Sequence, residues 1–122
     1  MTLKEALRAL AASRAEVEAA EERLEAARAI GCTTVADAPV RKRVKVSGVL
    51  RSVTFRPRQG VMALEAELYD GSGSLALVWL GRREIAGIVP GRRLTADGLV
   101  CVIEGKRTIF NPRYELRPRA GE

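Results

Sequence analysis

The stretch YDGSGSLALVWLGRR (residues 69–83) decides between two kinds of protein, because it places two glycines among small polar residues ahead of an apolar run. A phosphate-binding loop leads from a strand into a helix, whose N-terminus supplies aligned amide groups. A hairpin leads from one strand into another, and an Asp-Gly pair at its tip is typical. The segments on either side therefore indicate whether the stretch belongs to a nucleotide-binding enzyme.

Strand-like segments lie on both sides of the glycines. Residues 63–70 (ALEAELYD) alternate between apolar and polar side chains, and residues 74–80 (SLALVWL) are apolar on both faces. The chain has neither a GK[ST] sequence nor a GxGxxG sequence with a downstream acid. We therefore predict a hairpin at Asp70-Gly71 and no phosphate-binding loop.

The rest of the chain from residue 41 onward has the pattern of an all-β module. We expect strands over residues 41–55, 63–70, 74–80 and 93–105, and a fifth over 106–110 and 113–117 that is broken at Asn111-Pro112. Gly48 and Gly98 each fall in the middle of a long strand, where glycine permits the bend that lets one strand serve both halves of a small barrel. The prediction is a mainly β chain with a five-stranded barrel.

The first thirty residues have a different pattern, that of one long helix over residues 2–30. Thr2 and Glu5 form a capping box, and Gly31 suits the position after the helix end. An apolar seam repeats every seven residues along the helix, with small residues at the companion positions: Leu3, Leu10, Val17 and Leu24 beside Ala6, Ser13, Ala20 and Ala27. This seam could pack on the following domain, or pair with another copy of the chain or a protein partner.

Charge is divided unequally between these two parts. The net charge is +6 over the 122 residues, −2 for residues 1–39 and +8 for residues 40–122. The positive excess belongs wholly to the β module and favours a polyanionic partner.

The composition excludes most catalytic and metal sites. The chain has no histidine, so the commonest general base and most zinc sites are absent. Cys32 and Cys101 form no CxxC pattern, and we expect small buried thiols there. Glu65, Glu67 and Asp70 could be taken for the metal ligands of a nuclease, but the aspartate falls in a turn and no activating group accompanies them. We expect a non-enzymatic protein without cofactor or metal.

No stretch has the length of a membrane span, and the N-terminus lacks the apolar segment of a signal peptide. We therefore expect no membrane association and a cytoplasmic location.

Three segments carry a resemblance to a known family: YDGSGSLALVWLGRR (69–83), IAGIVPGRRLTADG (85–98) and IFNPRYEL (109–116). Together they resemble small bacterial OB-fold nucleic-acid-binding proteins and, more distantly, the OB-type wedge domain of the RecG branch-migration helicase. The resemblance covers about residues 40–117. The helix lies outside it. The residue patterns and the resemblance together predict an N-terminal helix over 1–31, a linker over 32–40, an OB-fold domain over 41–118 and a tail over 119–122.

OB domains that grip single strands combine a basic groove with aromatic stacking platforms. The cations that could serve here lie on the first strand and its loop, after the third strand, and around the last two strands: Arg51, Arg56, Arg58, Arg82, Arg83, Lys106, Arg107 and Arg113. The aromatic candidates are Tyr69, Trp79, Phe110 and Tyr114, of which Trp79 could equally fill the barrel core, whereas Phe55 is expected in the core. Glu65 and Glu67 should point outward on the binding face and weaken the attraction for phosphate.

These features predict a non-catalytic nucleic-acid-binding protein with little sequence specificity. The resemblance to the helicase wedge favours DNA over RNA, single-stranded or at a junction. The alternative is a protein-interaction module that uses the helix for oligomerisation or for docking a partner.

Overall fold

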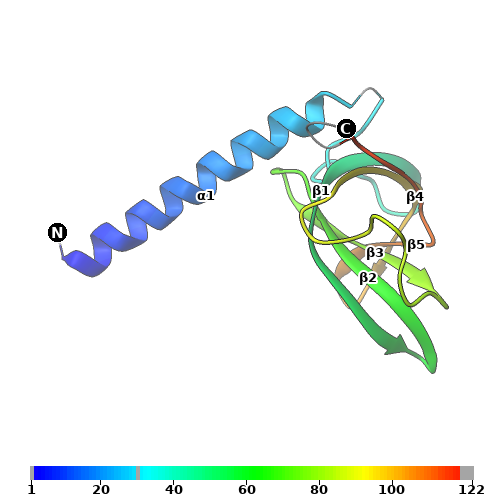
Figure 1. Ribbon diagram of the computed structural model, residues 1–122. Helices are drawn as coiled ribbons and strands as arrows, with labels where there is room; N and C mark the ends of the chain where they lie inside the picture. The colour runs from blue at the N-terminus through cyan, green and yellow to red at the C-terminus, as the bar shows by residue number, and fades with distance from the viewer. Residues whose placement is uncertain (1, 30, 119–122) are drawn as a thin grey trace.

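The computed structural model describes residues 2–29 and 31–118, in which one helix precedes a sheet of six strands (Figure 1). The elements are α1 (Leu3–Ala27), β1 (Arg43–Arg58), β2 (Val61–Tyr69), β3 (Ser74–Leu80), β4 (Arg93–Ile103), β5 (Lys106–Phe110) and β6 (Arg113–Leu116).

Five of the strands close into a barrel in the order β1-β2-β3-β5-β4, with β4 pairing back to β1. β3 and β5 are parallel, and the other neighbours in the ring are antiparallel. The predicted five-stranded barrel is therefore confirmed. The last predicted strand is broken at Asn111-Pro112, as expected, into β5 and β6. Both pieces pair antiparallel with β4, Ile109 opposite Val100 and Arg113 opposite Asp97, and Asn111 adopts a left-handed φ of 49° at the break.

The bend of β1 closes the barrel, as the mid-strand glycine predicted. The first half of β1 pairs with β4 and the second half with β2, and Val49 pairs with a residue of each neighbour. Next to this point Gly48 lies so close to β2 that a Cβ there would be 2.5 Å from the Tyr69 carbonyl oxygen. A bulge between Leu50 and Ser52 adds to the bend.

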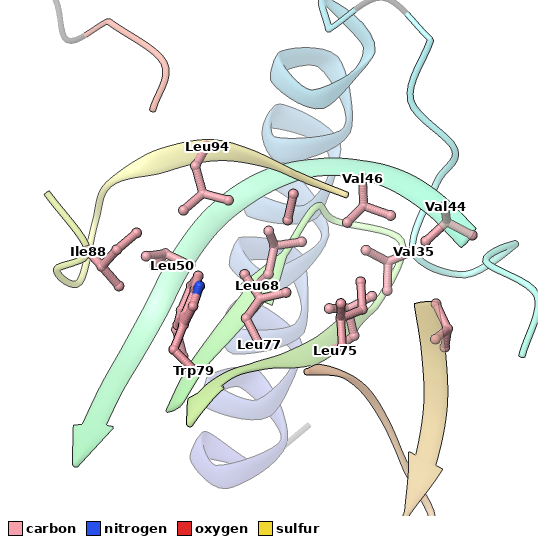
Figure 2. Packing of buried hydrophobic residues seen from close by; sticks show 14 of the residues in the cluster. Val35, Val44, Val46, Leu50, Leu68, Leu75, Leu77, Trp79, Ile88 and Leu94 are labelled. Carbon is pink, nitrogen blue, oxygen red and sulfur yellow. The ribbon is translucent and has the colours of Figure 1, made fainter. Parts of the chain in front are cut away.

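Alternate residues of each strand fill the barrel interior. Figure 2 shows this core, in which Leu50, Leu68, Leu77 and Leu94 are fully buried. Burial of each such side chain contributes about 1.5–3 kcal/mol to folding. The core is aliphatic apart from Trp79, which the barrel encloses almost completely.

The DGSGS stretch is a hairpin turn, as predicted, since β2 and β3 are antiparallel on either side of it. The Asp70 carboxylate organises the turn by accepting hydrogen bonds from the amides of Ser72 at 2.9 Å and Gly73 at 3.2 Å. It also accepts from the Val35 amide at 2.8 Å, although Asp70 itself is buried. This one side chain ties the turn to the segment before the barrel.

Residues 32–40, expected as a linker, pack on the barrel instead of spanning free space. Val35 and Ala38 are buried in the core cluster. The Arg107 guanidinium donates hydrogen bonds to the carbonyl oxygens of both residues. The segment forms a plug at one end of the barrel, and its apolar positions are too few and too irregular for their burial to be predicted from periodicity.

The capping box at Thr2 and Glu5 is present, as predicted. The helix ends earlier than expected, at Ala27, with Arg28 as its C-cap residue. Gly31 has a left-handed φ of 79° beyond this end and turns the chain toward the plug rather than capping the helix.

The last third of α1 docks on the barrel while the rest extends away from it (Figure 1). Arg93 donates hydrogen bonds to both carboxylate oxygens of Glu22, and this bonding raises the pKa of Arg93 above its ordinary value. Arg117 donates to the Glu25 carbonyl oxygen at 3.0 Å. The hairpin turn also meets the helix, because a Cβ on Gly71 would lie 2.1 Å from the Ala19 carbonyl oxygen.

The two cysteines are free and half-buried, less enclosed than expected. Burial raises the pKa of the Cys32 thiol, and the charges of Lys45 and Arg117 offset part of that rise. No helix within residues 2–29 and 31–118 combines the length and hydropathy that a membrane crossing requires.

Candidate nucleic-acid interface

A groove of about 740 Å³ opens between the β1–β2 hairpin and the β4–β5 turn. It is lined by Arg56, Pro57, Arg58, Gln59, Val61, Leu80, Ile103, Glu104 and Phe110. Its size lies within the range of ligand-binding clefts.

Strand register brings these residues onto one outer face of the barrel. Thr54 pairs with Glu65, Glu65 pairs with Val78, and Val78 pairs with Phe110, so one row crosses four strands. Neighbours in such a row project to the same side of a sheet. This row faces away from the core, so Glu65 and Phe110 lie on the groove side.

Glu65 holds two arginines of β1 at the edge of the groove. Its carboxylate is 2.7 Å from Nη2 of Arg56 and accepts a hydrogen bond from Nε of Arg58. Glu65 points outward, as predicted, but the arginines cover it, and only 11% of its side chain is exposed. Each guanidinium has five donors, so the ion pair orders both arginines and leaves donors free for a ligand.

Phe110 is the aromatic residue of the groove. The Arg58 guanidinium carbon lies 5.9 Å from the centroid of its ring, at the outer limit of a cation–π contact. The ring is half-buried among the strands. The Arg58 guanidinium lies over the Phe110 ring, and both are flat groups of the kind on which nucleic-acid bases stack.

Carboxylates balance the cations around the groove. Lys106 lies 3.9 Å from Glu67 on the β5 side. Glu104 lines the groove from the β4–β5 turn, where its backbone has a left-handed φ of 52°. Local attraction for phosphate is thus smaller than the +8 of residues 40–122 suggests.

Several predicted contact residues lie outside the groove. The Arg51 guanidinium stacks on the Tyr69 ring, 3.3 Å from its centroid. Arg82 and Arg83 follow β3, and Arg83 lies 5.7 Å from the ring of Phe55. Phe55 is 39% exposed, so its predicted place in the core is wrong. It lies near the turn of the β1–β2 hairpin, beyond the reach of the barrel interior.

Arg113 and Tyr114 lie on β6, opposite Asp97 and Ala96 of β4, and neither lines the groove.

Two of the predicted contact residues, Trp79 and Arg107, stabilise the fold and do not face a ligand. Trp79 is only 5% exposed, and its indole nitrogen donates to the Pro112 carbonyl oxygen at 3.3 Å. The Tyr114 ring meets it edge-on at 5.7 Å. Trp79 therefore takes the core alternative and is not available for stacking. Arg107 is likewise committed to the plug, because its guanidinium donates to buried backbone carbonyls.

The sequence analysis missed three apolar residues that line the groove: Val61, Leu80 and Ile103. Only Leu80 could have been found, because residues 74–80 are apolar on both faces and an outward-facing apolar residue is typical of a binding surface. Val61 and Ile103 flank turns, where periodicity gives no orientation. Hairpin length decides that they meet across the groove.

Glu65, Glu67 and Asp70, which the sequence analysis set aside as nuclease ligands, do not form a metal-binding group. Asp70 is engaged by backbone amides and Glu65 by arginines. Within the parts of the chain that the structure describes, no three His, Cys, Asp or Glu residues are grouped so as to hold a metal ion.

Comparison with solved structures identifies this architecture. The chain has an OB fold. It aligns with RecG bound to a three-way DNA junction at a TM-score of 0.56 and 24% identity, over 70% of this chain and 12% of the RecG chain. It also aligns with a replication protein A heterotrimer bound to single-stranded DNA, at a TM-score of 0.50 and 13% identity, over 80% of this chain and 76% of that one.

The resemblance in residues 69–83, 85–98 and 109–116 is thus confirmed as a distant one, at the level of the OB fold. This chain corresponds to a small part of RecG's length. No protein-family model matches the chain, and no curated protein sequence matches it.

Proposed function

We propose that this OB-fold chain binds nucleic acid without catalysing a reaction, and that the strand lies in the groove between the β1–β2 hairpin and the β4–β5 turn. The observation that carries the proposal is the cluster of Arg56 and Arg58 from β1 and Phe110 from β5 in that groove. It joins phosphate donors to a stacking surface within one cleft.

Each part of the groove suits a part of a nucleic-acid strand. Arg56 exposes 59% of its side chain and can donate to phosphate oxygens while it remains paired with Glu65. Phe110 and the plane of Arg58 suit the face of a base. Val61 and Leu80 suit the apolar faces of sugars and bases. In these roles the groups contact phosphates and the faces of bases and do not read the hydrogen-bonding edge of a base, so we expect little sequence specificity.

The preferred substrate in this proposal is single-stranded or junction DNA. Bases in a duplex are already stacked, so only an unpaired base can use Phe110. The structural neighbours in complexes with a DNA junction and with single-stranded DNA support DNA over RNA. Because carboxylates offset the cations, we expect modest affinity, with about three phosphate contacts and a loss of about tenfold to twentyfold between 50 and 200 mM salt.

Fluorescence anisotropy tests the proposal with labelled single-stranded DNA, duplex DNA, a forked junction and single-stranded RNA. Arg56→Glu should reduce binding to the preferred form by at least about tenfold. Arg43→Glu is the matched control, since Arg43 also lies on β1 and pairs with a carboxylate, Asp97, but does not line the groove. Equal loss of affinity in both variants would contradict the groove as the binding site. No binding to any of the four nucleic acids at low salt would refute nucleic-acid binding.

A protein-interaction module is the alternative, favoured by the exposed seam of α1. Leu10 and Val17 are each more than half exposed. In that case polar changes at these positions would disrupt the functional complex. Arg56→Glu would then leave nucleic-acid affinity near background.

A further inference from the structure

The apolar seam of α1 points away from the barrel to which the helix is attached. Only one face of the helix is shielded by the barrel, and it carries Ala19, Glu22, Glu25 and Ala26. The seam lies on the opposite face, and its large members are exposed: Leu3 77%, Leu10 55%, Val17 54% and Leu24 70%. Water therefore contacts four large apolar side chains in one line.

From this arrangement we infer that two copies of the chain associate through an antiparallel pairing of their α1 helices. Docking on the barrel uses the face opposite the seam. A second helix can therefore lie along the seam while each barrel stays on the outer side of the pair.

Side-chain size favours a helix partner with the same sequence. The seam alternates large residues with small ones, so an antiparallel copy can place each large residue opposite a small one. When Val17 of one copy lies opposite Ala20 of the other, Leu10 lies opposite Ala27 and Leu24 opposite Ser13. Leu10, Val17 and Leu24 of both helices are then buried without overpacking, and Leu3 lies beyond the end of the other helix.

Charges beside the seam select this orientation and register. One flank carries Glu16 and Arg23, and the other carries Arg14 and Glu21. With Val17 opposite Ala20, each Arg14 meets the Glu21 of the other copy, and each Glu16 meets its Arg23. Four attractive pairs form, of the kind that fixes orientation in coiled coils.

The competing arrangements bring like charges together. In a parallel pair, Glu16 would face Glu21 and Arg23 would face Arg28. A shift of the antiparallel pair by one heptad toward the N-terminus would set Arg14 against Arg14 and Glu16 against Glu16. A shift the other way would do the same for Glu21 and Arg23. The sequence thus favours one arrangement over its nearest alternatives.

Sedimentation velocity of the full chain, from about 5 to about 500 μM, tests the association. We expect the weight-average mass to rise with concentration from 13.3 kDa toward twice that value. Val17→Glu should weaken the association at least about tenfold, because it places a charge in the seam. Ala15→Glu, on an exposed face off the seam, adds the same charge and should leave the association unchanged. A mass that stays at one chain throughout, or equal effects of the two variants, would overturn the inference.

Orientation has its own test by pulsed electron resonance on a spin label at Lys4→Cys, with Cys32 and Cys101 replaced by serine. The two labels should lie about 45 Å apart in the antiparallel pair and within about 20 Å in a parallel one. The long distance would support the arrangement, and the short one would refute it. Neither measurement involves nucleic acid, so failure here leaves the proposed function untouched.

Discussion

At the scale of single residues, Glu65 controls how much positive charge the groove offers. It contacts two arginines at once and is itself almost enclosed by them. A carboxylate in this place fixes the guanidinium planes, which helps recognition, but it also cancels charge, which lowers affinity. The balance between these effects can be measured.

Glu65→Gln should raise affinity for single-stranded DNA several-fold at about 50 mM salt, because Arg56 and Arg58 lose a competing anion. For each additional phosphate then contacted, the slope of log affinity against log salt should steepen by about 0.7. Anisotropy titrations over a range of salt concentrations give both quantities.

Asp97→Asn is the control, because Asp97 also pairs with an arginine of β1 and lies outside the groove. It should leave affinity and slope unchanged. Weaker binding by Glu65→Gln would mean that ordering the arginines matters more than their charge.

Phe110→Leu should weaken single-stranded DNA binding by about 1–3 kcal/mol, the contribution of one stacked base, while leucine keeps the strand's apolar contacts. Binding to duplex DNA should hardly change, since paired bases cannot reach the ring. Phe55→Leu, which alters an exposed aromatic outside the groove, should have little effect on either. A loss of equal size for both DNA forms would indicate a folding defect, which urea unfolding of the variant would reveal.

At the scale of elements, the β2–β3 turn is the joint between barrel, plug and helix. Asp70 binds the plug through the Val35 amide, and Gly71 touches the backbone of α1. Gly71 has a left-handed φ of 88°, and its missing side chain leaves room for the Ala19 carbonyl. The turn therefore positions the helix as well as reversing the chain.

Gly71→Ala should release the docked part of α1, because the added methyl group would overlap the Ala19 carbonyl oxygen. Gly60→Ala is a matched control: its φ of 81° is similar, but no atom lies within 4 Å of the added carbon. Both variants should lose about 1–2 kcal/mol of unfolding free energy from backbone strain. Only Gly71→Ala should also speed amide hydrogen exchange in residues 19–27. Slow exchange there in Gly71→Ala would contradict a role of the β2–β3 turn in positioning the helix.

The same elements explain what could be predicted from the sequence. Three features could be predicted because each depends on a few neighbouring residues: the turn at Asp70-Gly71, the bend at Gly48 and the capping box at Thr2. The plug was missed because the residues that bind the Val35 backbone, Asp70 and Arg107, are distant in sequence.

The candidate site was predicted less well than the fold. Residue types identified Arg56, Arg58 and Phe110, but charge and aromaticity alone could not separate them from Arg107 and Trp79. Strand register decides that Phe110 faces outward and Trp79 inward. Register depends on pairings across the whole barrel, which composition does not encode.

At the scale of the whole molecule, the OB barrel and the helix have separate tasks in our proposals. The barrel carries the groove, and the helix carries the self-association surface on the side that faces away from it. In the antiparallel pair, the two barrels lie on opposite outer sides of the helices. One long strand could then reach both grooves, so the second contact would be made within a single complex.

Dimerisation should therefore strengthen binding to long single-stranded DNA more than to short DNA. An oligonucleotide of about 10 nucleotides fits one OB domain, and one of about 40 nucleotides has room for two. At concentrations where the chain is dimeric, we expect at least about tenfold tighter binding to the longer strand after correction for the number of sites, because the second groove acts at a high effective concentration. Val17→Glu should remove this gain and preserve binding to the short strand, whereas Ala15→Glu should preserve both. If Val17→Glu weakens binding to the short and the long strand equally, helix and groove are coupled within one chain. If the tighter binding to the long strand survives in a variant shown to be monomeric, it arises from the DNA length alone.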